Sequence, residues 1–96
     1  MSPSDLLAQN RDEILRLAAR YGATNVRVFG SVARGEAHEE SDIDFLVRME
    51  QGRSIFDLAA LVAELETLLG RRVDVVPDDA IYWLLRRRIL SEAQPL

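Results

Sequence analysis

Asp42 and Asp44 are the residues of this sequence whose type and spacing most directly suggest chemistry. They are separated by a single residue at the start of an apolar run, so in a strand their side chains project from the same face. Two like charges that close repel each other unless one takes up a proton or a cation lies between them. A hard divalent cation such as Mg²⁺, which prefers oxygen ligands, fits such a pair.

A third carboxylate, Asp74, is the single acidic residue in a run of valines. Burying it without a partner there would cost free energy. If its strand neighbours that of Asp42 and Asp44, three carboxylates converge, which is an arrangement for two Mg²⁺ ions and a triphosphate. The alternative is a carboxylate on an edge strand that pairs with Arg71 or Arg72.

Gly30 and Ser31 follow the apolar run 26–29 and form the second chemical feature. A glycine lets the strand end in a sharp turn and lets a phosphate approach the backbone closely. A short helix that begins here would direct free N–H groups at the same spot. The Ser31 hydroxyl and Arg34 are further donors for phosphate oxygens, although Arg34 is also compatible with a plain surface position.

The elements that must position these residues alternate between helix and strand. Ser2 and Ser54 are expected N-caps, with Asp57 completing a capping box, and Gly22 and Gly70 are expected to end helices. The patterns predict helices over 3–21, 55–69 and from 78 or 79 to 92, a short helix after Gly30, and strands over 26–29, 43–47 and 73–76. We therefore expect an α/β (α+β) fold, a small mixed sheet of about three to four strands covered by helices, in one domain over 1–96.

Composition excludes several kinds of site. The 96 residues contain no cysteine, which excludes disulfides and thiolate chemistry, and all 12 basic residues are arginines, which excludes a catalytic lysine. The net charge of −4 argues against direct nucleic-acid binding, which usually requires a basic surface. The sequence shows neither a signal peptide nor an apolar run of about 20 residues, so we expect a cytoplasmic protein without a membrane span.

Gly30-Ser31, followed after ten residues by Asp42-Ile43-Asp44 and later by Asp74, resembles the DNA polymerase β-type nucleotidyltransferase superfamily. The string GSVARGEAHEESDIDFLV and the short length resemble the minimal nucleotidyltransferases, which are commonly encoded as antitoxin partners of HEPN-domain proteins. The resemblance spans residues 26–76 in detail, and the ending 88–93 is also similar to that of the family.

The resemblance implies a role for each motif residue. Gly30 and Ser31 would bind the phosphates of ATP, and Asp42 and Asp44 would each ligate Mg²⁺. Asp74 would complete the metal site and act as, or position, the base that activates an incoming hydroxyl. The implied reaction moves AMP from ATP to a hydroxyl, with tyrosine the expected acceptor, of a cognate HEPN toxin.

Two other functions stay open on the sequence alone. The first is a non-catalytic antitoxin that neutralises its toxin by binding. The second is a small-molecule nucleotidyltransferase, which the lack of room for an acceptor-binding domain disfavours. Outside the motif, His38 is expected to be a solvated loop residue, and Arg86 to Arg88 form either a solvated helix face or a docking patch for an acidic partner.

Overall fold

The computed structural model describes residues 2–81 and 83–96, and the side chains of these residues except at 83 and 84. A four-stranded sheet has the order β3-β2-β1-β4, in which β1 is antiparallel to β2 and β4 while β2 and β3 are parallel. The expected mixed sheet covered by helices is therefore confirmed. The elements along the chain are α1 (Pro3–Gln9), α2 (Arg11–Arg20), β1 (Ala23–Phe29), α3 (Gly30–Ala33), β2 (Ile43–Met49), α4 (Ile55–Leu69), β3 (Val73–Pro77), the 3₁₀ helix η1 (Asp78–Ala80), α5 (Trp83–Glu92) and β4 (Gln94–Pro95).

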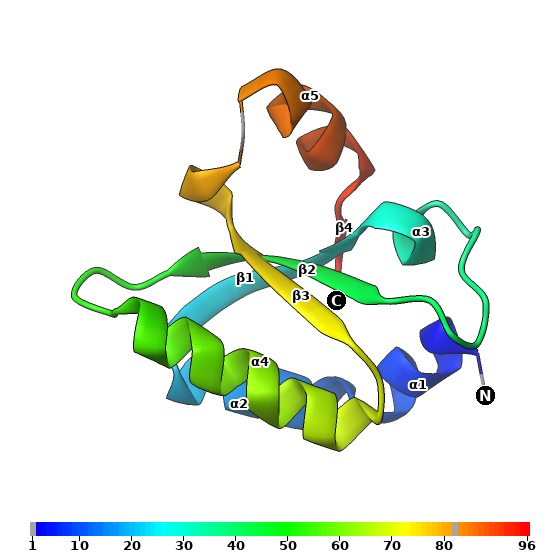
Figure 1. The fold of residues 1–96 in the computed structure, drawn as a ribbon, viewed down its shortest axis with the longest axis horizontal. Coiled ribbons are helices and arrows are strands. Elements are labelled where there is room, and N and C mark those ends of the chain that lie inside the picture. Colours follow the sequence, from blue (N-terminus) through cyan, green and yellow to red (C-terminus); the bar gives the residue numbers. More distant parts are fainter. Residues whose placement is uncertain (1, 82) are drawn as a thin grey trace.

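The helices lie on both faces of the sheet (Figure 1). Helices α2 and α4 cover one face and contact each other, whereas α5 lies over the opposite face. The main core fills the space between the sheet and α2 and α4, and its most deeply buried side chains are Ile14, Ile43, Phe45, Val47, Leu61 and Leu65. None of the helices in the described ranges is long and apolar enough to cross a bilayer.

The expected helix caps are present. The Ser54 hydroxyl accepts a hydrogen bond from the Phe56 amide at 3.1 Å, and the Asp57 carboxylate accepts one from the Ser54 amide at 3.0 Å. The hydrogen bond with the Ser54 backbone is the main cause that holds the pKa of Asp57 below its usual range. Gly70 ends α4 in the left-handed region with φ 67°, a conformation that glycine adopts without steric cost.

The first predicted helix is broken in two at Asn10. Its side-chain amide donates to the Leu6 carbonyl at 2.9 Å and its backbone N–H donates to the same carbonyl at 3.2 Å. A side chain that caps the preceding turn competes with continued helical bonding, so α1 ends and α2 begins in a new direction. Helical periodicity does not register such a break, because the apolar spacing continues across it.

The C-terminal region differs from the prediction in two further ways. The expected helix from residue 78 is divided into η1 and α5, because Ile81 adopts an extended conformation with φ −71° and ψ 129°. The Leu85 side chain is 49% exposed rather than packed on an inner helix face, and the Leu84 side chain lies outside those that the structure describes. Strand β4 was not predicted, since a two-residue strand containing a proline has no detectable alternation.

Candidate active site

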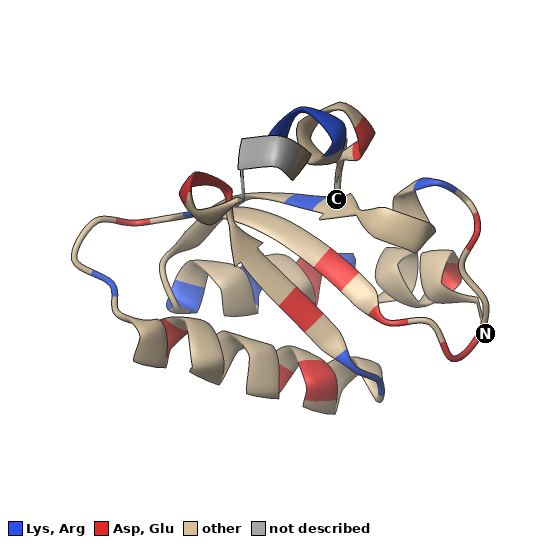
Figure 2. Ribbon diagram, turned by 45° about the horizontal axis from the view of Figure 1, so that its top comes forward, with Lys and Arg blue, Asp and Glu red and all other residues tan. Residues whose placement is uncertain are grey.

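Asp44 and Asp74 lie opposite each other on two neighbouring strands. In the parallel pairing of β2 with β3, Asp44 is the register partner of Asp74, as Ile43 is of Val73. Val73 is buried against α4, whereas Asp74 is exposed, so the aspartates face away from the main core. The acidic positions of the two strands lie side by side in Figure 2.

The pKa of Asp44 is raised to about 6 by its burial together with the closeness of the Asp74 carboxylate. Burial of Asp44 is the largest cause, followed by the negative charge of Asp74, a hydrogen bond with Asp74 and the charge of Asp42. Arg34 acts in the opposite direction and lowers the pKa of Asp44. Like charges in a partly desolvated site favour protonation of one of them when no cation is present.

Asp42 lies one residue before β2 and is exposed. Its charge reaches Asp44, but residues 2–81 and 83–96 contain no group of three His, Cys, Asp or Glu side chains placed to hold a metal ion. The structure thus brings together Asp44 and Asp74, with Asp42 near them rather than in a closed set of three. The donor chemistry still fits a divalent cation, because the ligands are all carboxylate oxygens and a cation would offset the burial and the repulsion that together raise the pKa of Asp44.

Asp74 differs from the expectation in one respect. The sequence suggested a carboxylate at risk of costly burial, but Asp74 is exposed, and it is Asp44 that is partly buried. The reason is the sheet order. β3 is an edge strand, whereas β2 is flanked by β1 and β3. The charge that needs neutralisation is therefore that of the pair rather than that of Asp74 alone.

The glycine turn adjoins these carboxylates. Gly30 follows Phe29, which is the register partner of Asp44 on the antiparallel side of β2. Gly30 has φ 73°, and a Cβ atom at this position would overlap the Oδ2 of Asp44. Ser31 comes next, in the four-residue helix α3, and is partly exposed. Both the backbone conformation and the close approach of a side chain therefore require glycine here.

Arg34, expected to face phosphates, is held by two carboxylates. Its Nε donates to Glu36 at 3.1 Å, and its Nη1 donates to both oxygens of Glu92 at 3.1 and 3.2 Å. The hydrogen bonds to Glu36 and then to Glu92 raise the pKa of Arg34 above its usual value. Sequence reasoning did not single out Glu92, and its only signal was its place in the C-terminal segment that resembles the family ending.

A cavity of about 240 Å³ opens between the glycine turn and α5, and Gly30, Arg34, Arg88 and Glu92 are among its lining residues. The glycine turn thus lies between this cavity and the Asp44–Asp74 pair, and its Gly30 amide donates to Glu92. A model of the nucleotidyltransferase domain family matches residues 11–96. The chain belongs to the nucleotidyltransferase family.

Relatives within this family agree with the assignment. The protein adenylyltransferase MntA of Thermococcus cleftensis is 41% identical over 76 residues, which cover 79% of this chain and 77% of that protein. A Methanocaldococcus jannaschii protein named "putative protein adenylyltransferase" is 44% identical over 81 residues, which cover 84% of this chain and 87% of that protein. This nucleotidyltransferase is thus an enzyme by family.

Solved structures share its fold. A structure described as that of a "putative minimal nucleotidyltransferase" is 52% identical, with a TM-score of 0.86 over 100% of this chain and 97% of that chain. A toxin–antitoxin structure with AMP-PNP has a TM-score of 0.76 at 23% identity, over 90% of this chain and 71% of that chain. At that identity the second likeness concerns the fold alone.

Proposed function

We propose that this nucleotidyltransferase transfers AMP from ATP, with Mg²⁺, to a hydroxyl group of a HEPN-domain toxin and so acts as the antitoxin. The observation that carries the proposal is the pairing of Asp44 with Asp74 directly beside the turn at Gly30. The relatives named protein adenylyltransferases support the reaction, and the toxin–antitoxin structures are compatible with the partner through their fold. The expected cytoplasmic location suits a reaction that uses ATP.

The three aspartates would hold the metal. Asp44 and Asp74 would bind from adjacent strands, and Asp42 would complete the set for two Mg²⁺ ions. When bound, Mg²⁺ supplies charge neutralisation on the triphosphate and on the pyrophosphate that leaves. Since Asp44 has a raised pKa, metal binding requires it to lose its proton, and affinity for Mg²⁺ rises with pH.

The glycine turn would position the nucleotide. Gly30, whose own amide donates to Glu92, would let a phosphate approach the backbone closely. Ser31 would donate its hydroxyl to the β- and γ-phosphates, and Arg34 would add positive charge at the same edge. The acceptor hydroxyl forms a bond to the α-phosphorus as the bond to the pyrophosphate oxygen breaks. Asp74, the more exposed member of the pair, would act as, or position, the base that takes the proton of that hydroxyl.

A transfer experiment tests this function. The protein is incubated with α-labelled ATP, Mg²⁺ and the product of the neighbouring gene, which the proposal expects to be a HEPN-domain toxin, and label on that product is measured with and without a chelator. We expect labelling that the chelator and Asp44→Asn both abolish. Asp12→Asn is the matched control, because the Asp12 side chain is 94% exposed and lies outside the site. Absence of labelling, together with full neutralisation of the toxin by Asp44→Asn, would exclude the enzymatic function.

A binding-only antitoxin is the second candidate, and one observation favours it. Within the part of the chain that the structure describes, three metal-type side chains do not form a closed set. Calorimetry with the toxin separates the two functions. A binding-only antitoxin forms a tight complex and neutralises the toxin without ATP, whereas an enzyme requires ATP and leaves a modified toxin.

A further inference from the structure

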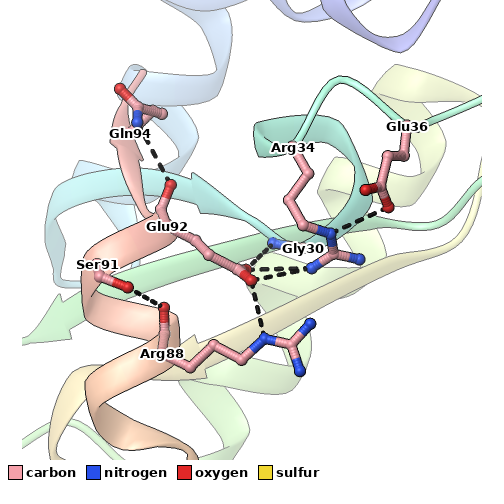
Figure 3. Close-up of polar contacts among 7 residues, drawn as sticks. All are labelled: Gly30, Arg34, Glu36, Arg88, Ser91, Glu92 and Gln94. Atoms are coloured by element: carbon pink, nitrogen blue, oxygen red, sulfur yellow. Dashed lines mark hydrogen bonds and ion pairs between the residues drawn. The ribbon is translucent and has the colours of Figure 1, made fainter.

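Glu92, the last residue of α5, connects the C-terminal region to the glycine turn (Figure 3). Its Oε2 accepts a hydrogen bond from the Gly30 amide at 3.4 Å across 62 residues of sequence. Both of its oxygens accept from Nη1 of Arg34, and its Oε1 also accepts from Nε of Arg88 at 3.1 Å. One carboxylate thus joins the beginning and the end of α3 to α5.

The backbone that carries Glu92 is fixed by the sheet. Two residues later, Gln94 pairs with Val28 in the contact of β4 with β1, and the Leu96 amide donates to the Val26 carbonyl at 3.0 Å. β1 is the strand that ends at Gly30. The backbone on which Glu92 lies and the turn that follows β1 are therefore both attached to the same strand.

The side chain of Glu92 is more buried than that of a typical residue in a surface ion pair. Its side chain is 15% exposed, whereas those of its neighbours Arg88 and Glu36 are 68% and 65% exposed. Burial tends to raise the pKa of Glu92, but the hydrogen bonds from Arg88, Arg34 and the Gly30 amide outweigh it and lower the pKa. An ionised and largely buried carboxylate with fixed partners defines geometry more strictly than an exposed pair does.

We propose that Glu92 is a positioning residue of the nucleotidyltransferase site, which holds the Gly30 turn and Arg34 in register with Asp44. Glu92 is linked to Asp44 through Gly30 and through Arg34. Glu92 accepts a hydrogen bond from the Gly30 amide, and the Asp44 carboxylate occupies the space that a Cβ atom would need at Gly30. The Arg34 guanidinium, oriented by Glu92, acts on Asp44 through its charge. Glu92 touches neither metal nor nucleotide in this scheme, and the inference rests on the proposed function.

The test compares Glu92→Gln with Glu36→Gln in the full-length protein. Glutamine retains the shape and one acceptor oxygen at position 92 but loses the charge that holds Arg34. Glu36→Gln removes a carboxylate from the same arginine without affecting Gly30. We expect Glu92→Gln to lower kcat for AMP transfer by about tenfold to a hundredfold, with KM for ATP within about threefold, because misplaced groups slow the reaction more than they weaken binding. Glu36→Gln should leave both constants within about twofold of the parent.

Amide hydrogen exchange supplies a readout that does not depend on activity. In Glu92→Gln, exchange at residues 30–34 should accelerate, while exchange in α4 and the melting temperature stay near those of the parent. Tighter ATP binding with unchanged kcat would overturn the proposal and make Glu92 a competitor of the phosphates. Unchanged exchange at residues 30–34 would also overturn it. If the parent protein transfers no AMP, the proposed function fails, and the exchange data still decide whether Glu92 fixes the turn.

Discussion

The Oδ2 atom of Asp44 occupies the space that a Cβ atom would need at Gly30. The turn at Gly30, which is proposed to bind phosphates, and the Asp44 carboxylate, which is proposed to bind metal, are therefore packed directly against each other. Under the proposed function, Gly30 would let the nucleotide approach the backbone, and Asp44 would hold the divalent cation that neutralises charge on the nucleotide, so their closeness would help to align the two. This contact also explains why the glycine is needed for packing as well as for its φ of 73°.

Gly30→Ala should destabilise the protein and abolish nucleotide transfer. The substitution adds a steric overlap with Asp44 to the cost of a positive φ, and together we expect a loss of about 2–4 kcal/mol in the free energy of unfolding. Urea unfolding and the labelling assay measure the two effects. Gly52→Ala is the matched control, because Gly52 has φ 88° but open space around a Cβ. It should cost only about 1 kcal/mol and leave transfer intact. Equal losses for the two variants would contradict the steric role of Asp44.

The raised pKa of Asp44 predicts a pH dependence of stability in the absence of Mg²⁺. Because the pKa is about 6 in the folded protein and 3.8 in a free side chain, the stabilising effect is complete below pH 3.8 and is lost as the pH rises through about 6. Asp44→Asn cannot ionise, so it should match the parent near pH 4 and be more stable at pH 7. Solvent screening of this half-buried group limits the difference to about 1 kcal/mol. Urea unfolding at several pH values measures it, and a difference that does not vary with pH would contradict the assignment.

Mg²⁺ should stabilise the parent protein by a pH-dependent amount. The ion binds the ionised carboxylates, so the rise in melting temperature at a fixed Mg²⁺ concentration should be larger at pH 7 than at pH 5. Asp44→Asn should show little rise at either pH. Differential scanning fluorimetry with Mg²⁺, and with Na⁺ at equal ionic strength as the control, tests this. A similar rise in the two proteins would place the ion elsewhere.

Ser54→Ala should weaken the protein without affecting its activity. The change removes the hydroxyl that caps the Phe56 amide at the start of α4, and Ser54 is not one of the residues assigned to the site. We expect a loss of about 1 kcal/mol in the free energy of unfolding, as for other helix caps. Thermal unfolding and AMP transfer are measured in parallel, and Ser54→Asp, which preserves the cap, should restore most of the stability. Loss of transfer at full stability would contradict a purely structural role.

The ion pair of Arg27 with Asp78 should contribute to stability more than surface pairs do. Its atoms are 3.0 Å apart and the two side chains are 15% and 18% exposed. Asp78→Ala leaves the Arg27 charge without its partner and should cost about 1–3 kcal/mol in chemical unfolding. The comparison is Asp12→Ala, whose pair with Arg11 is 3.7 Å long and involves a 94% exposed carboxylate, with an expected cost below about 0.5 kcal/mol.

The local features of this protein follow from short-range patterns in its amino-acid order. The caps of α4 at Ser54 and Gly70, the acidic pair Asp42 and Asp44, and the turn at Gly30 were all identifiable from spacing. Each depends on residues a few positions apart, and such interactions follow from helix or strand geometry alone. The resemblance to nucleotidyltransferases could also be recognised from these motifs, because the spacing of Gly30-Ser31 and Asp42-Ile43-Asp44 is typical of enzymes that bind a nucleotide triphosphate.

Contacts between residues far apart in the chain could be known only from the folded arrangement of the strands and helices. The order β3-β2-β1-β4 placed Asp74 beside Asp44, and the pairing of β4 with β1 brought Glu92 to the glycine turn 62 residues away. The fold also brings Arg34 into contact with the carboxylates of Glu36 and Glu92 instead of leaving it in open solvent. The alternation of a single strand shows which face a side chain takes but not which strand lies next to it. That choice depends on packing of the whole sheet and its helices, where contacts are non-local and many pairings satisfy the same local pattern.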